Sequence, residues 1–245
     1  MIRNQMILGL VALSLASVLN AKECVSPITR SAKYHQQSAE IKALQLQTYK
    51  MAKIALDNNL KLIKDRKPAI ILDLDETVLD TSDYASYLIK NCIKYTKETW
   101  DNYEKQGTSK LIAGALDFLE YAHSKGVMIF YVSNRTHKNK ALVLKMLKNL
   151  KLPQVSGVSV LLEEKDKPKE IRRKLVAKDY TIILQIGDTL HDFDAIFAKD
   201  AKNSQEQQKK VLQNAQKFGT EWIILPNSLY GTWDNEPLNA WQNEK

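Results

Sequence analysis

The segment Ile70-Ile-Leu-Asp73-Leu-Asp75-Glu76-Thr77-Val78-Leu79-Asp80 gives the first indication of both the fold and the chemistry of this chain. It begins as a short apolar run behind Pro68, the pattern of a buried β-strand. Asp73 and Asp75 stand two positions apart where this strand ends. Two carboxylates placed there repel each other and lose hydration, so they need a compensating cation or a proton held between them.

A divalent metal ion would supply that compensation. A ligand set made only of oxygen atoms favours Mg²⁺ over Zn²⁺, which prefers His and Cys. The D-x-D spacing also occurs in EF-hand loops, but Val78 stands where that loop requires Gly, and Thr77 replaces Asp or Asn. The sequence therefore predicts a Mg²⁺ site at the end of this strand.

The rest of the chain alternates between two patterns. Apolar runs typical of buried strands recur at 127–132, 158–162, 180–186 and 222–225. Stretches typical of helices lie at 111–125, 138–150, 169–178 and 195–218, and helical spacing of apolar residues also marks 31–65. Strands that alternate with helices predict the α/β class, with a parallel sheet covered on both faces.

The aromatic and charged stretch 81–109 interrupts this alternation directly after the first strand. An insertion there would lie above the carboxyl ends of the strands, where open α/β sheets bind ligands. We therefore expect one domain over 22–245, with a core of about 66–80 and 111–235 and a small helical cap of about 31–65 and 81–110.

A second acidic cluster follows another predicted strand, in Ile186-Gly187-Asp188-Thr189-Leu190-His191-Asp192-Phe193-Asp194. Gly187 would allow a tight turn as the strand ends, and Asp188 and Asp192 could then face the first pair of carboxylates. Because both clusters end strands of one predicted sheet, each strengthens the interpretation of the other as part of a metal site.

Two further residues could complete a site for a phosphate group. Ser133 follows a predicted strand and offers a hydroxyl group and nearby backbone N–H groups to an anion. Lys169 would begin a helix and could neutralise phosphoryl charge. Each residue taken alone would be a common structural residue, so their candidate role depends on the acidic clusters.

In sequence order, DLDETVLD, VSNR, K-x-x-R and GDTLHD resemble the four motifs of the haloacid dehalogenase (HAD) superfamily. DLDETVLD together with the closing Leu225-Pro-Asn227-Ser-Leu-Tyr230-Gly231-Thr-Trp233 is similar to the class C acid phosphatases, which are exported bacterial nucleotidases. The resemblance runs from about Gln36 to Trp233. It implies a HAD-like parallel sheet and hydrolysis of 5′-nucleotides and other small phosphomonoesters.

The same resemblance implies catalytic roles. Asp73 would be the nucleophile that forms an aspartyl-phosphate. Asp75 would protonate the leaving group and then deprotonate the attacking water. Ser133 and Lys169 would stabilise the oxygens of the transferring phosphoryl group.

It also implies a ligand set and substrate contacts. Mg²⁺ would be held by the Asp73 side chain, the Asp75 backbone carbonyl and the Asp188 side chain. Asp192 would lie outside this set and orient a water molecule or the lysine. Substrate contacts are expected from the remaining candidates, Asn134, Tyr230 and Trp100.

Residues 1–21 have the pattern of a cleaved secretory signal peptide: Arg3, then an uncharged apolar stretch that ends at Leu19, then Ala21. The apolar stretch is short for a membrane anchor, which needs about 20 residues. Lys22 and Glu23 precede Cys24, so we do not expect lipid attachment. We expect export to the periplasm or cell envelope, where Cys24 and Cys92 either join or stay as two thiols.

A formal net charge of +8 over 245 residues is compatible with nucleic acid, an anionic surface or a phosphorylated substrate. We expect small phosphorylated partners such as nucleoside monophosphates and no nucleic acid, while the homodimer that the family implies and a peripheral membrane association stay open. One alternative function is a phosphotransferase that passes the phosphoryl group to an alcohol. Another is an exported haem- or anion-binding protein with a vestigial site, although all the candidate catalytic residues are present.

Overall fold

The computed structural model describes residues 28–64, 66–165, 167–198 and 203–241. The predicted signal peptide and Cys24 lie outside these residues, so export and the pairing of the two cysteines stay predictions. Among the described helices, none combines the length and the apolar composition that a membrane crossing requires.

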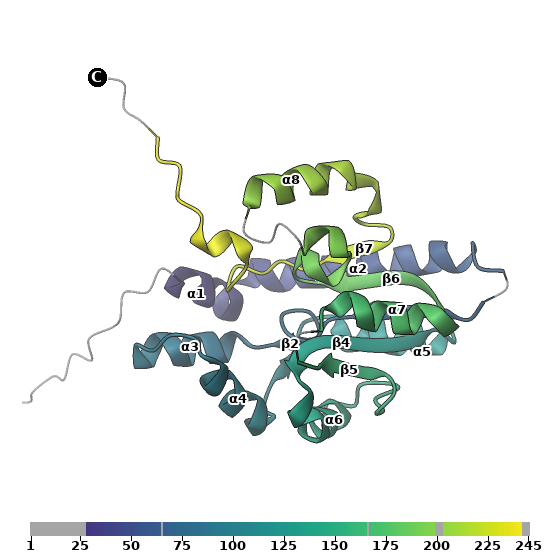
Figure 1. The fold of residues 1–245 in the computed structure, drawn as a ribbon, viewed down its shortest axis with the longest axis horizontal. Coiled ribbons are helices and arrows are strands. Elements are labelled where there is room, and N and C mark those ends of the chain that lie inside the picture. Colours follow the sequence, from purple (N-terminus) through teal and green to yellow (C-terminus); the bar gives the residue numbers. More distant parts are fainter. Residues whose placement is uncertain (1–27, 65, 166, 199–202, 242–245) are drawn as a thin grey trace, which may run out of the picture.

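Five parallel strands form the central sheet, in the order β5-β4-β1-β6-β7 (Figure 1). Their bounds are β1 Pro68–Leu72, β4 Met128–Thr136, β5 Val160–Glu163, β6 Thr181–Gly187 and β7 Trp222–Ile224. Each strand overlaps one of the predicted apolar runs, which confirms the predicted α/β class. Because β1 lies in the centre, its carboxyl end is flanked by the ends of β4 and β6, the place where such sheets bind ligands.

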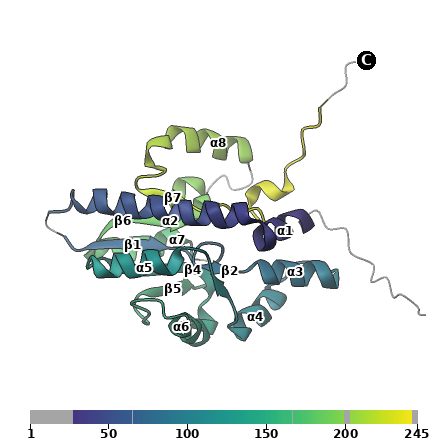
Figure 2. The ribbon, with the colours of Figure 1, turned by 180° about the vertical axis from the view of Figure 1, so that it is seen from behind.

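Alternate residues of β1 face opposite sides of the sheet. Ile70 and Leu72 enter the larger core, whereas Ala69 and Ile71 enter the smaller one, and all four are buried. The larger core is completed by α2 (Ala39–Leu60), α5 (Ala115–Ser124) and α6 (Lys140–Asn149). Helix α7 (Lys169–Asp179) covers the other face, and Figures 1 and 2 show the two sides. Both faces of the sheet are therefore covered, as predicted.

Helix α2 corrects the prediction that the whole of 31–65 belongs to the cap. Its buried residues Tyr49 and Leu56 lie in the larger core, and α2 contacts β6, β7 and α5. Helix α1 (Thr29–Gln37) packs against the cap, through α3. The Ser38 side chain accepts hydrogen bonds from the first N–H groups of α2 and so separates the two helices.

A short antiparallel strand pair carries the predicted insertion 81–109. Its elements are β2 (Leu79–Asp80), α3 (Ser82–Asn91), α4 (Lys97–Gln106) and β3 (Lys110–Leu111). Helices α3 and α4 lie beyond one end of the sheet, and α3 lies beside α1 (Figures 1 and 2). The cap has an aromatic core of its own, in which the Trp100 ring centroid lies 5.0 Å from that of Tyr84 and 5.4 Å from that of Tyr103.

The stretch 195–218, predicted as one helix, is divided in the structure. It contains η3 (Ala195–Phe197), α8 (Ser204–Gln213) and η4 (Ala215–Lys217). Elsewhere in the described residues, further 3-10 turns are η1 (His137–Asn139), η2 (Leu190–Asp192) and η5 (Thr232–Asn235). The Asn203 side chain accepts the Glu206 N–H and caps the start of α8. The composition of this stretch indicates one continuous helix, but Asn203 caps the start of a separate helix within it.

Leu56→Ala should lower the free energy of unfolding by about 2–5 kcal/mol, because a cavity would replace a side chain in the core. The matched control on the same helix is Ile54→Ala, since Ile54 is 59% exposed whereas Leu56 is 0% exposed. The control should change the free energy of unfolding by no more than about 0.5 kcal/mol. Urea denaturation measures both, and equal small effects would contradict the placement of α2 in the core.

Candidate active site

The carboxyl ends of β1, β4 and β6 bring the predicted residues to one edge of the sheet. Leu72, the last residue of β1, is in register with Tyr131 of β4 and Ile186 of β6. The Asp73 N–H then donates to the Ile186 carbonyl at 3.0 Å. Ser133 lies two residues beyond Tyr131 on β4. Parallel pairing therefore places both acidic clusters and Ser133 at the same end of the sheet.

Lys169, the first residue of α7, holds its ammonium group between two carboxylates. Its Nζ lies 2.5 Å from Asp73 Oδ1 and also forms an ion pair with Asp192 Oδ1. All three residues are buried. Burial works against the charged ammonium, but Asp192 and Asp73 raise the pKa of Lys169 above its usual value. The lysine is therefore charged and offsets part of the buried negative charge.

A second cation, Arg135, pairs with Asp75. Arg135 Nη2 lies 2.7 Å from Asp75 Oδ1, and Nε lies 3.1 Å from each carboxylate oxygen. The arginine is only 1% exposed. Sequence reasoning gave this residue no role. The alternation of side chains along β4 could have indicated that Arg135 is buried, because a strand that buries Ser133 also buries the residue two positions later.

Asp188 receives hydrogen bonds from neutral groups of the described residues. Asn227 Nδ2 donates to Oδ2 at 2.8 Å, and Thr77 Oγ1 donates to Oδ1 at 3.2 Å. Burial, Asp192 and Asp73 together raise the pKa of Asp188 well above its usual range. One carboxylate oxygen from each of Asp73, Asp188 and Asp192 lies within 4.8 Å of the others. Asn227 and Thr77 were quoted in the motifs but were not predicted as site residues.

These carboxylates fit a divalent metal ion. Five buried carboxyl groups form the cluster, and they outnumber the two side-chain cations of the described residues that form ion pairs with them, Lys169 and Arg135. The carboxyl groups are those of Asp73, Asp75, Glu76, Asp188 and Asp192. An excess of buried negative charge presented by oxygen atoms alone is the environment that hard divalent cations prefer. Asp192 Oδ1 pairs with the Lys169 ammonium and Oδ2 accepts bonds from Thr189, whereas the described partners of Asp188 are neutral and the Lys169 ion pair uses only Oδ1 of Asp73. The Asp73 and Asp188 side chains are therefore the better candidate ligands.

Ser133 and Asn134 point in different directions. Ser133 is buried, its Oγ accepts the Arg135 N–H at 3.1 Å, and its hydroxyl hydrogen can still be donated to a ligand. Asn134 is exposed, and its Oδ1 accepts a hydrogen bond from Arg172 Nη2 at 2.9 Å. The Asn134 side chain is thus turned toward α7, and its contact with substrate stays a prediction.

Tyr230 is fixed at its hydroxyl end, which donates to the Glu76 carboxylate. The residue as a whole is nevertheless 42% exposed. Glu76 is buried with a left-handed backbone (φ 53°), and it also accepts the Thr81 N–H at 3.0 Å. Burial, followed by the charge of Asp75, raises the pKa of Glu76 to about 8. Tyr230 is thus bonded to the carboxylate cluster through its hydroxyl group while the residue stays partly exposed.

Trp100 reaches the site indirectly. It packs against the cap tyrosines, and the guanidinium carbon of Arg135 lies 5.7 Å from its ring centroid. Its described contacts are therefore with protein groups, and its contact with substrate stays a prediction.

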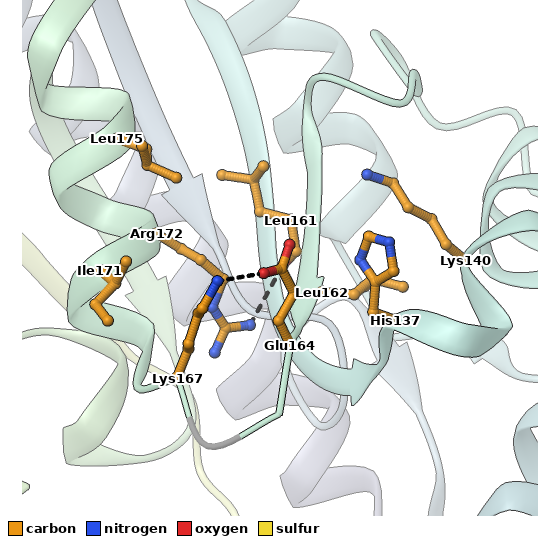
Figure 3. A pocket seen from close by; sticks show the side chains of 9 residues that line it. All are labelled: His137, Lys140, Leu161, Leu162, Glu164, Lys167, Ile171, Arg172 and Leu175. Carbon is orange, nitrogen blue, oxygen red and sulfur yellow. Dashed lines mark hydrogen bonds and ion pairs between the residues drawn. The ribbon is translucent and has the colours of Figure 1, made fainter.

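A cavity of about 90 Å³ borders Arg172, beside α7 and the segment that follows β5 (Figure 3). Ile171 and Leu175 contribute apolar surface, and an ion pair of 2.6 Å joins Lys167 to Glu164. Of the predicted catalytic residues that the structure describes, none lines this cavity. It is therefore separate from the carboxylate cluster.

Comparisons with known proteins agree with this geometry. Residues 12–233 match the family model described as HAD superfamily, subfamily IIIB (acid phosphatase). The chain is similar to the class C acid phosphatase from Bacillus anthracis, at 36% identity and a TM-score of 0.78, over 83% of this chain and 85% of that chain. A structure of that enzyme with tungstate bound gives the same identity, TM-score and coverage. These matches confirm the resemblance that the four motifs predicted.

Gly187→Ala should lower kcat/KM for 4-nitrophenyl phosphate by about 100-fold, because small displacements of positioned groups are costly. A Cβ atom at Gly187 would lie 2.3 Å from the Cβ of Asp192, so Asp192 and the lysine it holds must move. The matched control is Gly157→Ala, whose added Cβ meets no atom within 4 Å. The control should keep wild-type kcat/KM, and wild-type activity in Gly187→Ala would contradict the importance of this contact.

Proposed function

The chain belongs to the acid phosphatases of HAD subfamily IIIB and is a phosphomonoesterase, and on that basis we propose that it is an exported, Mg²⁺-dependent enzyme that hydrolyses 5′-nucleotides and other small phosphomonoesters. One observation carries the proposed chemistry: Asp73 is buried at the end of the central strand with Lys169 Nζ 2.5 Å from its Oδ1. A carboxylate held in this way is preorganised as a nucleophile, because its position is set before the substrate arrives.

In the first step an oxygen of Asp73 attacks phosphorus. The new bond to phosphorus forms as the bond to the leaving oxygen breaks, which gives an aspartyl-phosphate. Asp75, protonated when the substrate binds, gives its proton to the leaving alkoxide. The Ser133 hydroxyl and the Lys169 ammonium stabilise the negative oxygens of the phosphoryl group during this transfer.

In the second step a water molecule attacks the phosphorus of the aspartyl-phosphate. Asp75 now acts as the base and accepts a proton from this water. The bond between phosphorus and Asp73 breaks, inorganic phosphate leaves, and both carboxyl groups return to their starting states. Hydrolysis thus divides into two displacements that use the same two carboxyl groups in turn.

Mg²⁺ would be held by the side chains of Asp73 and Asp188 and by the backbone carbonyl of Asp75. When bound, the ion supplies positive charge that offsets the phosphoryl oxygens. The oxygen-only ligand set and the excess of buried carboxylates support this assignment. Asp192 would act through its ion pair with Lys169, which keeps the ammonium group beside Asp73.

The partial exposure of Tyr230 beside the carboxylate cluster supports a nucleoside monophosphate as the substrate. An aromatic ring beside the catalytic carboxylates can stack on a base, and stacking tolerates different bases because every base has a π-face. The formal net charge of +8 attracts anions to the protein. Tungstate, an oxyanion like phosphate, is bound in one structure of the Bacillus anthracis enzyme, which supports oxyanion binding here as well.

Phosphate release from AMP by 22–245 should require added Mg²⁺, stop with a chelator and return when excess Mg²⁺ is restored. Asp73→Asn should lower kcat at least about 1,000-fold, because removal of a nucleophile removes the covalent route. Asp179→Asn is the matched control, since Asp179 is exposed at the end of α7 and should leave kcat unchanged. Unchanged release by Asp73→Asn would overturn the mechanism.

Tyr230→Leu should raise KM for AMP about 10-fold, because base stacking on an aromatic ring contributes roughly 1–3 kcal/mol. The KM for glycerol phosphate, which has no base, should change much less. Tyr230→Phe keeps the ring and loses the hydrogen bond to Glu76, so it separates stacking from anchoring. Equal KM increases for both substrates in Tyr230→Leu would contradict a base-binding role.

Export would be tested by expressing the full chain in a Gram-negative host and sequencing the N-terminus of the protein recovered from the periplasm. We expect a new N-terminus at Lys22, because Ala21 is the predicted cleavage point. Recovery of the chain only from the cytoplasm, with Met1 retained, would contradict export.

A further inference from the structure

Arg135 is buried with its donors directed at groups of the site and the cap. A buried guanidinium is costly unless its donors find acceptors. Nε and Nη2 both reach the Asp75 carboxylate, at 2.7–3.1 Å, and Nη1 faces Met146 Sδ at 4.0 Å. Burial works against the charged guanidinium, but Asp75 raises the pKa of Arg135 above its usual value. The principal partner of this arginine is therefore the residue proposed to move protons.

The two oxygens of Asp75 are used unequally. Oδ1 accepts both Nη2 at 2.7 Å and Nε at 3.1 Å, whereas Oδ2 accepts only the shared Nε at 3.1 Å. A carboxylate oxygen has two lone pairs. Among the bonds that the described residues make, Oδ1 has both positions taken and Oδ2 keeps one. Oδ2 is thus the oxygen free to hold a proton and pass it on.

Without the arginine, the direction of the Asp75 side chain would be set by repulsion. Asp73, Asp75 and Glu76 stand within four consecutive residues at the end of β1 and are all buried, so their carboxyl groups repel one another. Lys169 does not offset the repulsion on the Asp75 carboxylate, because its ion pairs are with Asp73 and Asp192. The Nε and Nη2 groups of Arg135, which both donate to Asp75, oppose this repulsion on the Asp75 side chain.

The cap holds the arginine from its other side. Ser109, near the end of the insertion, accepts a hydrogen bond from Arg135 Nη2 at 3.2 Å, and its Oγ also lies 3.2 Å from the Tyr103 hydroxyl. The Trp100 ring lies 5.7 Å from the guanidinium carbon, within the range of a cation–π contact. The cap is therefore connected to Asp75 through Arg135.

We propose that Arg135 is a positioning residue for Asp75: it fixes the carboxylate so that Oδ2 faces the leaving oxygen, and the cap residues Ser109 and Trp100 hold Arg135 in turn. This inference rests on the proposed role of Asp75 as the acid that protonates the leaving group.

The test compares two substrates that differ in their need for a proton. 4-Nitrophenyl phosphate releases a stable phenolate, whereas AMP releases an alkoxide that must be protonated. Arg135→Lys keeps the charge and loses the fork, so it should lower kcat/KM for AMP roughly 10–100-fold but kcat/KM for 4-nitrophenyl phosphate less than about 3-fold. The comparison uses kcat/KM because this ratio reports the first step alone, whereas kcat also includes the second step, in which Asp75 is the base for both substrates.

Three further variants and a control complete the experiment. Ser109→Ala removes one hydrogen bond that holds Arg135, so it should give a smaller loss of activity that is again larger for AMP than for 4-nitrophenyl phosphate. This variant tests the proposal if Arg135→Lys does not fold. In Asp75→Asn, adding Arg135→Lys should lower kcat no further, because residues that act through one another are not additive. Arg66→Lys is the matched control, since Arg66 bonds the carbonyls of Ala177 and Lys178 at the end of α7, and its kcat should be unchanged.

Equal losses of kcat/KM on both substrates, an additive loss in the double variant or no loss in Arg135→Lys would overturn the proposal. If Asp75→Asn itself lowers kcat/KM by the same factor on both substrates, the proposed role of Asp75 as the acid fails and the role of Arg135 fails with it. If Asp75→Asn loses activity selectively on AMP and Arg135→Lys does not, only the role of Arg135 is overturned.

Discussion

Repulsion among buried carboxylates at the carboxyl end of β1 is the constraint on which the rest of the site depends. The sequence predicted that a metal ion would relieve it, and the structure adds two protein cations that relieve different parts of it. Lys169 lies between Asp73 and Asp192, whereas Arg135 pairs with Asp75. Neighbouring acids with different partners are suited to different roles. The remaining negative charge, centred on Asp188, is left for a divalent ion to offset.

The fold provides each of these partners from a different element. Parallel pairing places the ends of β1, β4 and β6 side by side, the start of α7 supplies the lysine, and the insertion after β1 places the cap over the same edge. The C-terminal segment closes the arrangement, because Asn227 donates to Asp188 and Tyr230 to Glu76. The carboxylates proposed as acid and nucleophile, and the tyrosine proposed to face the substrate, are therefore held by contacts between distant parts of the chain.

The sheet and its acidic clusters could be predicted because both are local: a buried strand is a short apolar run, and D-x-D follows it directly. The residues that pair with these carboxylates from other parts of the fold could not be predicted. Arg135 lies 60 positions from Asp75, so the alternation along β4 can indicate that the arginine is buried but not which carboxylate it pairs with. The periodicity of 31–65 predicts helices but not the surface that they cover, which is why α2 was assigned to the cap. Residue type alone likewise gave no direction for Asn134, whose side chain turns toward α7.

The central claim is that Asp73 carries the phosphoryl group between the two steps. The most direct measurement is an acid quench during turnover of AMP, followed by mass spectrometry of the peptide that contains Asp73. We expect one phosphoryl adduct on Asp73, stable in acid and removed by hydroxylamine, as is characteristic of an acyl phosphate. An adduct on any other residue would contradict this claim.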